Sequence, residues 1–213
     1  MQRTVWIFDL DNTLHNATPH IFPHINRSMT AYLQQHLALD EATANQLRMD
    51  YWQRYGATLS GMMQHHATDP DHFLWHTHQF PELPNMVLRE TRLRTVLQRL
   101  PGKKIVFSNA PEHYAAAVLR LLRVDDLFAD VFAIEQARYR PKPQLAGFLR
   151  LLRKHRLTAA RCVMVEDSVE NLQTAKRLGM RTVWISNTTQ KPSYVDVKIR
   201  DVLDLPRALS RLN

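Results

Sequence analysis

Two patterns of hydrophobic positions alternate along most of the chain. Short runs of consecutive apolar residues indicate buried strands, whereas apolar positions that recur every three or four residues indicate helices. After a first strand around Val5 and Ile7, the runs predict strands at residues 104–107, 131–134, 161–165 and 181–185. The helical spacing predicts helices at residues 89–100, 111–122, 144–154, 169–178 and 201–212. This alternation predicts an α/β fold with a doubly wound parallel sheet.

The segment between the first and second strands has a different pattern. From about residue 18 to residue 82 it contains no strand-like run, and Ile21, Ile25 and Met29 fall on one helical face. Prolines at positions 81 and 84 indicate a rigid exit from the segment. We therefore expect a helical cap, residues 17–83, inserted into a core made of residues 1–16 and 84–213.

Composition fits one sizeable core with a small insertion, and the charge is uneven. The chain has 213 residues, of which 45% are hydrophobic, and its net charge is +8. Residues 1–80 hold 4 Lys and Arg against 7 Asp and Glu, while residues 81–213 hold 24 against 13. A basic body favours anionic ligands such as phosphate esters. The basic residues are scattered along the predicted helices, which is more typical of a solvated surface than of a nucleic-acid-binding stripe.

Several sequence features bear on location. No apolar stretch approaches the roughly 18 residues that cross a membrane. The first strand begins almost at once, which leaves no room for a signal peptide. Cys162 is the single cysteine, so an internal disulfide is impossible and a buried structural thiol is expected. A cytoplasmic protein without a membrane partner is the expectation.

The first strand ends in two carboxylates, Asp9 and Asp11. Residues two apart on a strand point to the same side, so these groups should face one space. They repel each other unless a cation joins them or one holds a proton. An isolated pair of this kind is often only a turn. A calcium loop is excluded, because it needs Gly at its sixth and Glu at its twelfth position, where this chain has Leu14 and His20.

Three further polar groups occur at comparable places. Ser108 and Asn109 follow the second predicted strand, and Glu166 and Asp167 follow the fourth. Lys142 lies between two prolines at the start of a predicted helix. In open parallel sheets, ligands bind beyond the carboxyl ends of the strands. We therefore expect all these groups to form one site.

At this point the chain resembles the haloacid dehalogenase (HAD) superfamily of phosphatases, which have a Rossmann-like core. Four motifs match in order: residues 9–13, then Ser108, then Lys142, then residues 166–167, with Asn171 following. Asn171 departs from the pattern, because many relatives carry Asp there. The match spans nearly the whole chain.

The closer resemblance is to the pyrimidine 5′-nucleotidase branch of that superfamily. It is carried by residues 11–14, 51–61 and 107–110, together with His113. The resemblance implies that Tyr55 and its neighbours contribute to substrate binding. Taken alone, an aromatic residue at this position is more often part of the cap interior than a surface for stacking a base.

Phosphate-ester hydrolysis requires a nucleophile and a proton donor. A carboxylate can attack phosphorus and divide the reaction into two easier steps, a role that we assign to Asp9. Asp11 then serves as the acid for the leaving alcohol and afterwards as the base that activates water. Lys142 is expected to neutralise both the phosphate and Asp9. Ser108, Asn109 and Thr13 are expected to bind the phosphate oxygens.

Magnesium fits this set of groups, because it prefers oxygen ligands and retains water. The family resemblance implies that Asp9 and Asp167 bind the ion directly, together with the main-chain carbonyl of Asp11. Glu166 is expected to bind through water or to support these ligands. A conflicting pattern, the histidines at 72, 76 and 78, resembles a metal-binding face, but no acid or thiol accompanies it and a cap surface is the preferred interpretation.

The sequence therefore predicts a magnesium-dependent phosphomonoesterase that acts on small-molecule nucleoside 5′-monophosphates, with a preference for pyrimidines. A phosphatase for a sugar phosphate or phosphoglycolate is the first alternative. A basic nucleic-acid-binding or regulatory protein is the second, and the intact set of catalytic groups argues against it. Dehalogenation is disfavoured, because the departure of a halide does not require the acid that Asp11 supplies.

Overall fold

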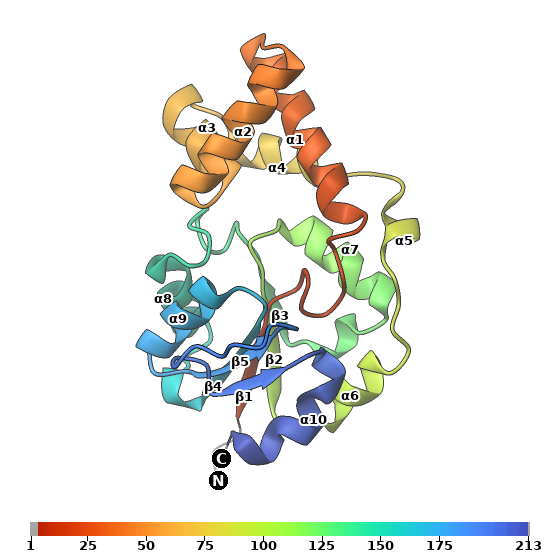
Figure 1. The fold of residues 1–213 in the computed structure, drawn as a ribbon, viewed down its shortest axis with the longest axis vertical. Coiled ribbons are helices and arrows are strands. Elements are labelled where there is room, and N and C mark those ends of the chain that lie inside the picture. The colour runs from red at the N-terminus through yellow and green to blue at the C-terminus, as the bar shows by residue number, and fades with distance from the viewer. Residues whose placement is uncertain (1–3, 213) are drawn as a thin grey trace.

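Within residues 4–212, which the computed structural model describes, six parallel strands form one sheet (Figure 1). The strand order is β3-β2-β1-β4-β5-β6. The strands are β1 Val5–Phe8, β2 Lys103–Phe107, β3 Asp130–Phe132, β4 Cys162–Glu166, β5 Arg181–Ile185 and β6 Val197–Ile199. The order reverses at β1, which creates the switch point beside which doubly wound sheets bind ligands. The predicted fold class is confirmed.

Side chains of the central strands enter two separate cores, one on each face of the sheet. Trp6 and Phe8 pack in one core, whereas Val5 and Ile7 pack in the other. The first core is completed by α6 Leu93–Arg99, α7 Glu112–Leu122 and α10 Leu205–Ala208, and the second by α8 Leu145–Lys154 and α9 Val169–Arg177. Burial on both faces explains why these strands are runs of apolar residues rather than alternating patterns.

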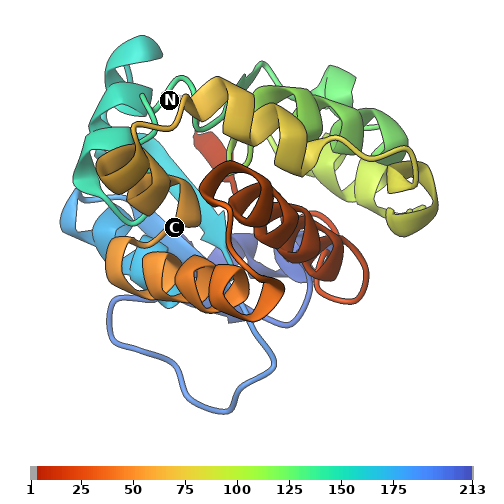
Figure 2. The ribbon, with the colours of Figure 1, turned by 90° about the horizontal axis from the view of Figure 1, so that it is seen from above.

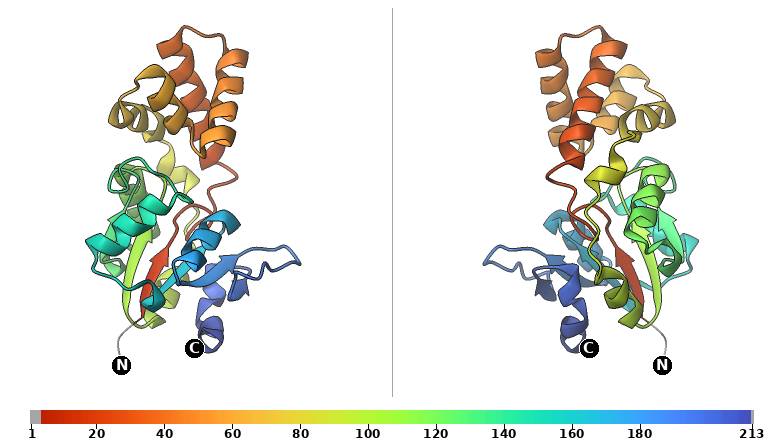
Figure 3. Two further views of the ribbon diagram at one scale, coloured as in Figure 1. Left: turned by 90° about the vertical axis from the view of Figure 1, so that its left-hand side faces the viewer. Right: turned by 90° about the vertical axis from the view of Figure 1, so that its right-hand side faces the viewer.

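Four helices of the inserted segment lie together beyond the carboxyl ends of the strands (Figures 1 and 3). They are α1 Ile21–Leu37, α2 Glu41–Tyr55, α3 Thr58–His66 and α4 Pro70–His78, and the short α5 Leu83–Met86 follows them. Seen from above, they lie over the sheet (Figure 2). They have an apolar core of their own, which includes Leu33, Met62 and Phe73 and reaches Ile134 of the sheet domain. The apolar core of the four helices therefore also packs them against the sheet domain.

The C-terminal part of the chain differs most from the prediction. The sequence pattern did not reveal β6, which has three residues and follows a long loop that projects from the sheet edge (Figure 2). The helix predicted at residues 201–212 is divided into the 3₁₀ turn Val202–Asp204, α10 and the 3₁₀ turn Leu209–Arg211. Pro206 explains one break, because proline lacks the N–H that an uninterrupted helix needs and favours a first turn.

Two smaller expectations can be compared with the structure. Cys162 is a free, fully buried thiol in β4, as predicted. Among the helices of residues 4–212, none is long and apolar enough to span a bilayer.

Candidate active site

The predicted polar residues meet where the central strands end. Asp9 follows β1, Ser108 follows β2, and Glu166 is the last residue of β4. The strands are in register, so these three positions lie at nearly the same level, and the Asp9 N–H donates to the carbonyl of Val165 at 3.0 Å. Lys142 reaches the same place from the segment before α8. The topology therefore brings the predicted groups together at the switch point.

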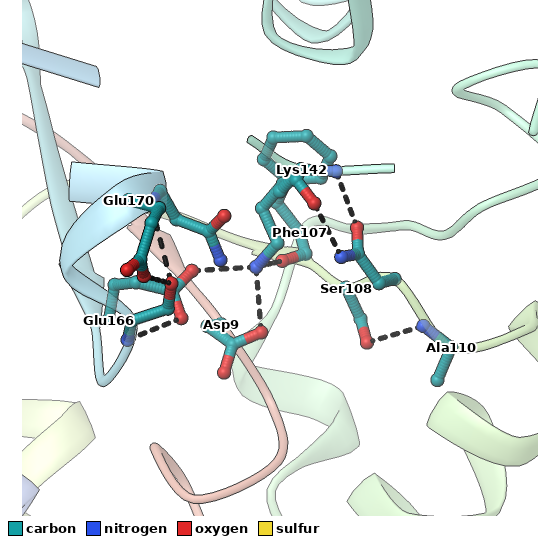
Figure 4. A network of polar contacts seen from close by, with 10 residues as sticks. Asp9, Phe107, Ser108, Ala110, Lys142, Glu166 and Glu170 are labelled. Carbon is teal, nitrogen blue, oxygen red and sulfur yellow. Dashed lines mark hydrogen bonds and ion pairs between the residues drawn. The ribbon is translucent and has the colours of Figure 1, made fainter. Parts of the chain in front are cut away.

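Lys142 is the centre of the buried network in Figure 4. Its Nζ donates to Asp9 Oδ1 at 2.7 Å, to Glu166 Oε2 at 2.8 Å and to the carbonyl of Phe107 at 2.8 Å. These three acceptors use all three hydrogens of the ammonium group. Because Lys142 is only 3% exposed, water does not replace any of these partners at low cost.

Asn109 holds the backbone of Lys142. Its Oδ1 accepts from the Lys142 N–H at 2.7 Å, and its Nδ2 donates to the Lys142 carbonyl at 3.0 Å. Both polar atoms of this side chain are therefore engaged with protein. The sequence predicts that Asn109 binds phosphate oxygens; in the structure its side chain bonds the backbone of Lys142.

Burial sets the protonation of these groups. Burial, followed by the charge of Glu166, raises the pKa of Asp9 to about 7 despite the opposing effect of Lys142. Burial likewise raises the pKa of Glu166 to about 7. Burial acts to lower the pKa of Lys142, but the two carboxylates outweigh it and leave that pKa above its usual value. Lys142 therefore stays charged, whereas both carboxyl groups hold their protons to a higher pH than usual.

The same carboxylates form a potential metal site. Asp9, Glu166 and Asp167 each offer an oxygen, and these atoms all lie within 4.8 Å of one another. Carboxylate oxygens are the donors that a hard divalent cation such as Mg²⁺ prefers. Glu166 already accepts from Lys142 and from the Ser168 N–H, so it is the most constrained of the three.

Asp11 has two partners that the sequence did not reveal. The Tyr114 hydroxyl donates to Asp11 Oδ1 at 2.6 Å, and His15 Nε2 lies 2.9 Å from the same oxygen. Tyr114 is separated from Asp11 by 103 positions, so no local pattern indicates the contact. His15 lies four residues after Asp11, but this spacing indicates a contact only once the geometry of the intervening turn is known.

Two hydroxyl groups lie in the remaining motifs. Ser108 is 2% exposed, and its Oγ accepts from the Ala110 N–H at 3.0 Å, which leaves the hydroxyl hydrogen free to donate. Thr13 is also buried, and its Oγ1 has no hydrogen-bond partner among the described residues. Asn171 lies in the first turn of α9, where its N–H donates to Ser168 Oγ at 3.5 Å.

Comparison with known proteins shows which family the chain belongs to. The family model of the haloacid dehalogenase-like hydrolases matches residues 4–179. The chain belongs to this family. Phosphate metabolism protein 8 of Saccharomyces cerevisiae is 24% identical to this HAD hydrolase over an alignment of 194 residues, which covers 84% of the chain and 60% of the yeast protein. The chain thus spans about 60% of the length of that relative.

Solved structures share the fold of this HAD hydrolase. A HAD phosphatase from Thermococcus onnurineus is 20% identical, with a TM-score of 0.69 and 98% of both chains covered. The HAD-hydrolase YfnB from Bacillus subtilis, bound to magnesium, is 15% identical with a TM-score of 0.65, covering 98% of this chain and 99% of that one. L-2-haloacid dehalogenase from Xanthobacter autotrophicus is 14% identical with a TM-score of 0.63, with the same coverage.

Among the inserted helices of this HAD hydrolase, residues 51–61 have structural partners. Tyr55 packs against the cap core, and its hydroxyl lies 2.6 Å from His65 Nε2. Thr58 is buried and donates to the carbonyl of Arg48 at 3.1 Å. Gly61 allows α3 to approach Tyr51, because a Cβ at this position would lie 2.2 Å from the tyrosine ring. Packing accounts for much of this segment.

Several histidines of the inserted helices lie within hydrogen-bond distance of tyrosine or threonine hydroxyls. His72 Nδ1 lies 2.9 Å from the Tyr32 hydroxyl, and His66 Nε2 lies 2.7 Å from the Tyr51 hydroxyl. The prediction of a surface position is wrong for His78, which is 8% exposed with its Nδ1 at 2.8 Å from Thr77 Oγ1. It faces the core because it ends α4, where the cap meets the sheet domain.

Proposed function

We propose that this HAD hydrolase is a magnesium-dependent phosphomonoesterase that acts on nucleoside 5′-monophosphates, with a preference for pyrimidines. One observation carries the proposal. Asp9 is held by a buried Lys142 at the switch point, and Asp11 is fixed two residues away by a separate pair of donors. This arrangement supplies a nucleophile, a neutralising cation and an independent acid and base.

The structural neighbours carry both phosphatase and dehalogenase names, so the fold does not choose between these reactions. The site favours phosphate-ester chemistry for two reasons. A halide leaves without a proton, whereas an alkoxide needs the acid that Asp11 can supply. The cluster of Asp9, Glu166 and Asp167 also suits a cation, and charge neutralisation is what attack on a phosphate anion requires.

The reaction proceeds in two steps on these residues. Asp9 attacks phosphorus and forms an aspartyl-phosphate, while the bond from phosphorus to the leaving oxygen breaks and that oxygen takes a proton from Asp11. Asp11 then removes a proton from water as the water oxygen attacks phosphorus and the bond to Asp9 breaks. Lys142 stays charged throughout and stabilises the negative charge on Asp9 and on the phosphoryl oxygens.

Magnesium completes the proposed site. Asp9, Asp167 and the main-chain carbonyl of Asp11 would hold the ion, with Glu166 supporting them from beside Lys142. When bound, the ion supplies Lewis-acid stabilisation of charge on the phosphoryl group. Ser108 and Thr13, whose hydroxyl groups have hydrogens to donate, are proposed to bind the phosphoryl oxygens.

The cap is proposed to select the leaving group. Its helices lie beyond the strand ends that carry the phosphate site (Figure 3), so the face of residues 17–83 that is turned toward this site would contact the nucleoside while residues 1–16 and 84–213 bind the phosphate. The nucleotidase-like sequence around Tyr55 supports a nucleoside monophosphate. A cytoplasmic location, where such nucleotides occur, is part of the same proposal.

A substrate panel tests this function. Purified protein should hydrolyse UMP and CMP with higher kcat/KM than AMP, GMP, phosphoglycolate or a hexose phosphate, and only with magnesium present. Asp9→Asn protein from the same preparation controls for contaminating phosphatases. If phosphoglycolate or a hexose phosphate is the best substrate, the nucleotide assignment fails and the phosphatase assignment stands. Absence of hydrolysis across the panel contradicts both.

A further inference from the structure

We propose that Tyr114 and His15 are positioning residues for the acid/base catalyst. They hold Oδ1 of Asp11 and so reserve Oδ2 for the proton that is transferred. This inference rests on the proposed phosphatase function and adds to it two residues that lie outside the motifs of the site.

The geometry places both partners on one oxygen. The Tyr114 hydroxyl donates to Oδ1 at 2.6 Å, and His15 Nε2 lies 2.9 Å from the same atom. Tyr114 is 1% exposed and the His15 side chain is fully buried, so water does not compete for these contacts. The Oδ2 atom of Asp11 has no hydrogen-bond partner among the described residues, and the Asp11 side chain is 15% exposed. Two donors use both lone pairs of Oδ1, and a proton can then be carried only by Oδ2.

Both partners act as donors. The Tyr114 hydroxyl is the donor in its contact with Asp11, because a carboxylate oxygen can only accept. His15 Nδ1 is buried and has no partner within residues 4–212. If the neutral imidazole carried its hydrogen on Nδ1, that buried N–H would have no acceptor. The lone pair of Nε2 would then face the Asp11 carboxylate, which is also unfavourable. Nε2 therefore carries a hydrogen and donates it to Asp11.

This arrangement serves both steps of the proposed reaction. In the first step, the proton on Oδ2 passes to the leaving oxygen as the bond from Asp9 to phosphorus forms. In the second step, Oδ2 receives a proton from the attacking water as that bond breaks. Oδ1 accepts the same two hydrogen bonds in both states, so Asp11 can load and release its proton without reorienting.

The test uses Tyr114→Phe, because the ring of Tyr114 also packs against His78 and Phe80, at centroid distances of 5.9 and 6.5 Å, and phenylalanine preserves that packing. p-Nitrophenyl phosphate has a leaving group that departs without a proton. The first step should therefore remain fast in the variant, whereas hydrolysis of the aspartyl-phosphate should be slow. We expect a burst of about one p-nitrophenol per active site, followed by a steady-state kcat lowered about 10- to 100-fold.

Two further measurements distinguish positioning from a general structural effect. With UMP, whose leaving group needs a proton, kcat of Tyr114→Phe should fall about 10- to 100-fold while KM stays unchanged or falls. Tyr32→Phe is the matched control, because Tyr32 is a buried cap tyrosine whose hydroxyl also bonds a histidine, His72, at 2.9 Å. Tyr32→Phe should behave as wild type.

A second pair of variants keeps the inference testable if Tyr114→Phe is poorly folded. His15→Gln retains a side-chain N–H donor, and His15→Leu does not. Turnover should be higher in His15→Gln than in His15→Leu. The inference is overturned if Tyr114→Phe shows wild-type kinetics without a burst, or if the two His15 variants have equal rates. In either case the phosphatase function stands as long as Asp9→Asn is inactive. If wild-type protein hydrolyses no phosphate ester, the proposed function fails and this inference fails with it.

Discussion

Replacement of Lys142 by methionine should destabilise the metal-free protein, and the loss should depend strongly on pH. The change removes three hydrogen bonds from a group that is 3% exposed and leaves Asp9 and Glu166 buried without a cation. Removing one partner from a buried ion pair costs about 3–5 kcal/mol when the remaining charge persists. We expect a loss of this size near pH 8.

The pH dependence follows from the raised carboxyl pKa values. Asp9 and Glu166 have pKa values of about 7 in the fold, against ordinary values of 3.8 and 4.5. A carboxyl group whose pKa is higher in the folded than in the unfolded protein stabilises the fold at pH values below its pKa in the unfolded protein. This stabilisation is lost as the pH rises through its pKa in the folded protein. Without Lys142 both values rise further. Near pH 5 both carboxyls are protonated and need no counterion, so the penalty of the substitution should be small.

Urea unfolding in the presence of EDTA, near pH 5 and near pH 8, measures this difference. Lys104→Met is the matched control. Lys104 is another buried lysine, but its Nζ bonds main-chain carbonyls, with the Leu100 oxygen at 2.8 Å, and no carboxylate within residues 4–212 is paired with it. Its substitution should cost a similar free energy at both pH values. Equal losses for Lys142→Met at the two pH values would refute the electrostatic account of the site.

Four other changes have defined outcomes. Asp9→Asn should abolish phosphate-ester turnover with an unaltered circular dichroism spectrum, because an amide is a poor nucleophile at phosphorus; wild-type activity would remove the covalent mechanism. EDTA should inactivate the enzyme and magnesium should restore its activity, whereas calcium should restore it poorly because calcium coordination is looser; full activity after exhaustive chelation would exclude the metal assignment. Asp167→Ala should raise the magnesium concentration that activity requires. Gly61→Ala should lower the free energy of unfolding by about 1–3 kcal/mol, because its Cβ would lie 2.2 Å from the Tyr51 ring; an unchanged urea midpoint would show that α2 and α3 separate without cost.

The sheet and the placement of its strand-end residues could be predicted because they follow from local patterns and one topological rule. Strands buried on both faces are short apolar runs, and the carboxyl ends of parallel strands share one edge. This is why Asp9, Ser108 and Glu166 could be expected together. The three-residue strand Val197–Ile199 is too short to produce a recognisable run and is stabilised by pairing with β5.

Contacts across long stretches of sequence could not be predicted in this way. Tyr114 lies on the helix predicted at residues 111–122, and its contact with Asp11 depends on how α7 packs against β1. Asn109 was expected at the substrate because it follows a strand, yet its side chain is fixed by the backbone of Lys142, 33 positions away. Polar side chains near a site can support other residues as readily as they can bind a ligand, and sequence spacing does not separate the two roles.

The central claim is that Asp9 becomes phosphorylated during turnover. Asp11→Asn protein, which should form the intermediate from p-nitrophenyl phosphate but hydrolyse it slowly, can be quenched in acid during turnover and digested for mass spectrometry. The account predicts a phosphoryl group on the peptide that contains Asp9, close to one per active site, and none in the variant that also carries Asp9→Asn. The account is contradicted if the wild-type protein turns over the ester but neither the wild-type protein nor Asp11→Asn yields a phosphorylated Asp9 peptide.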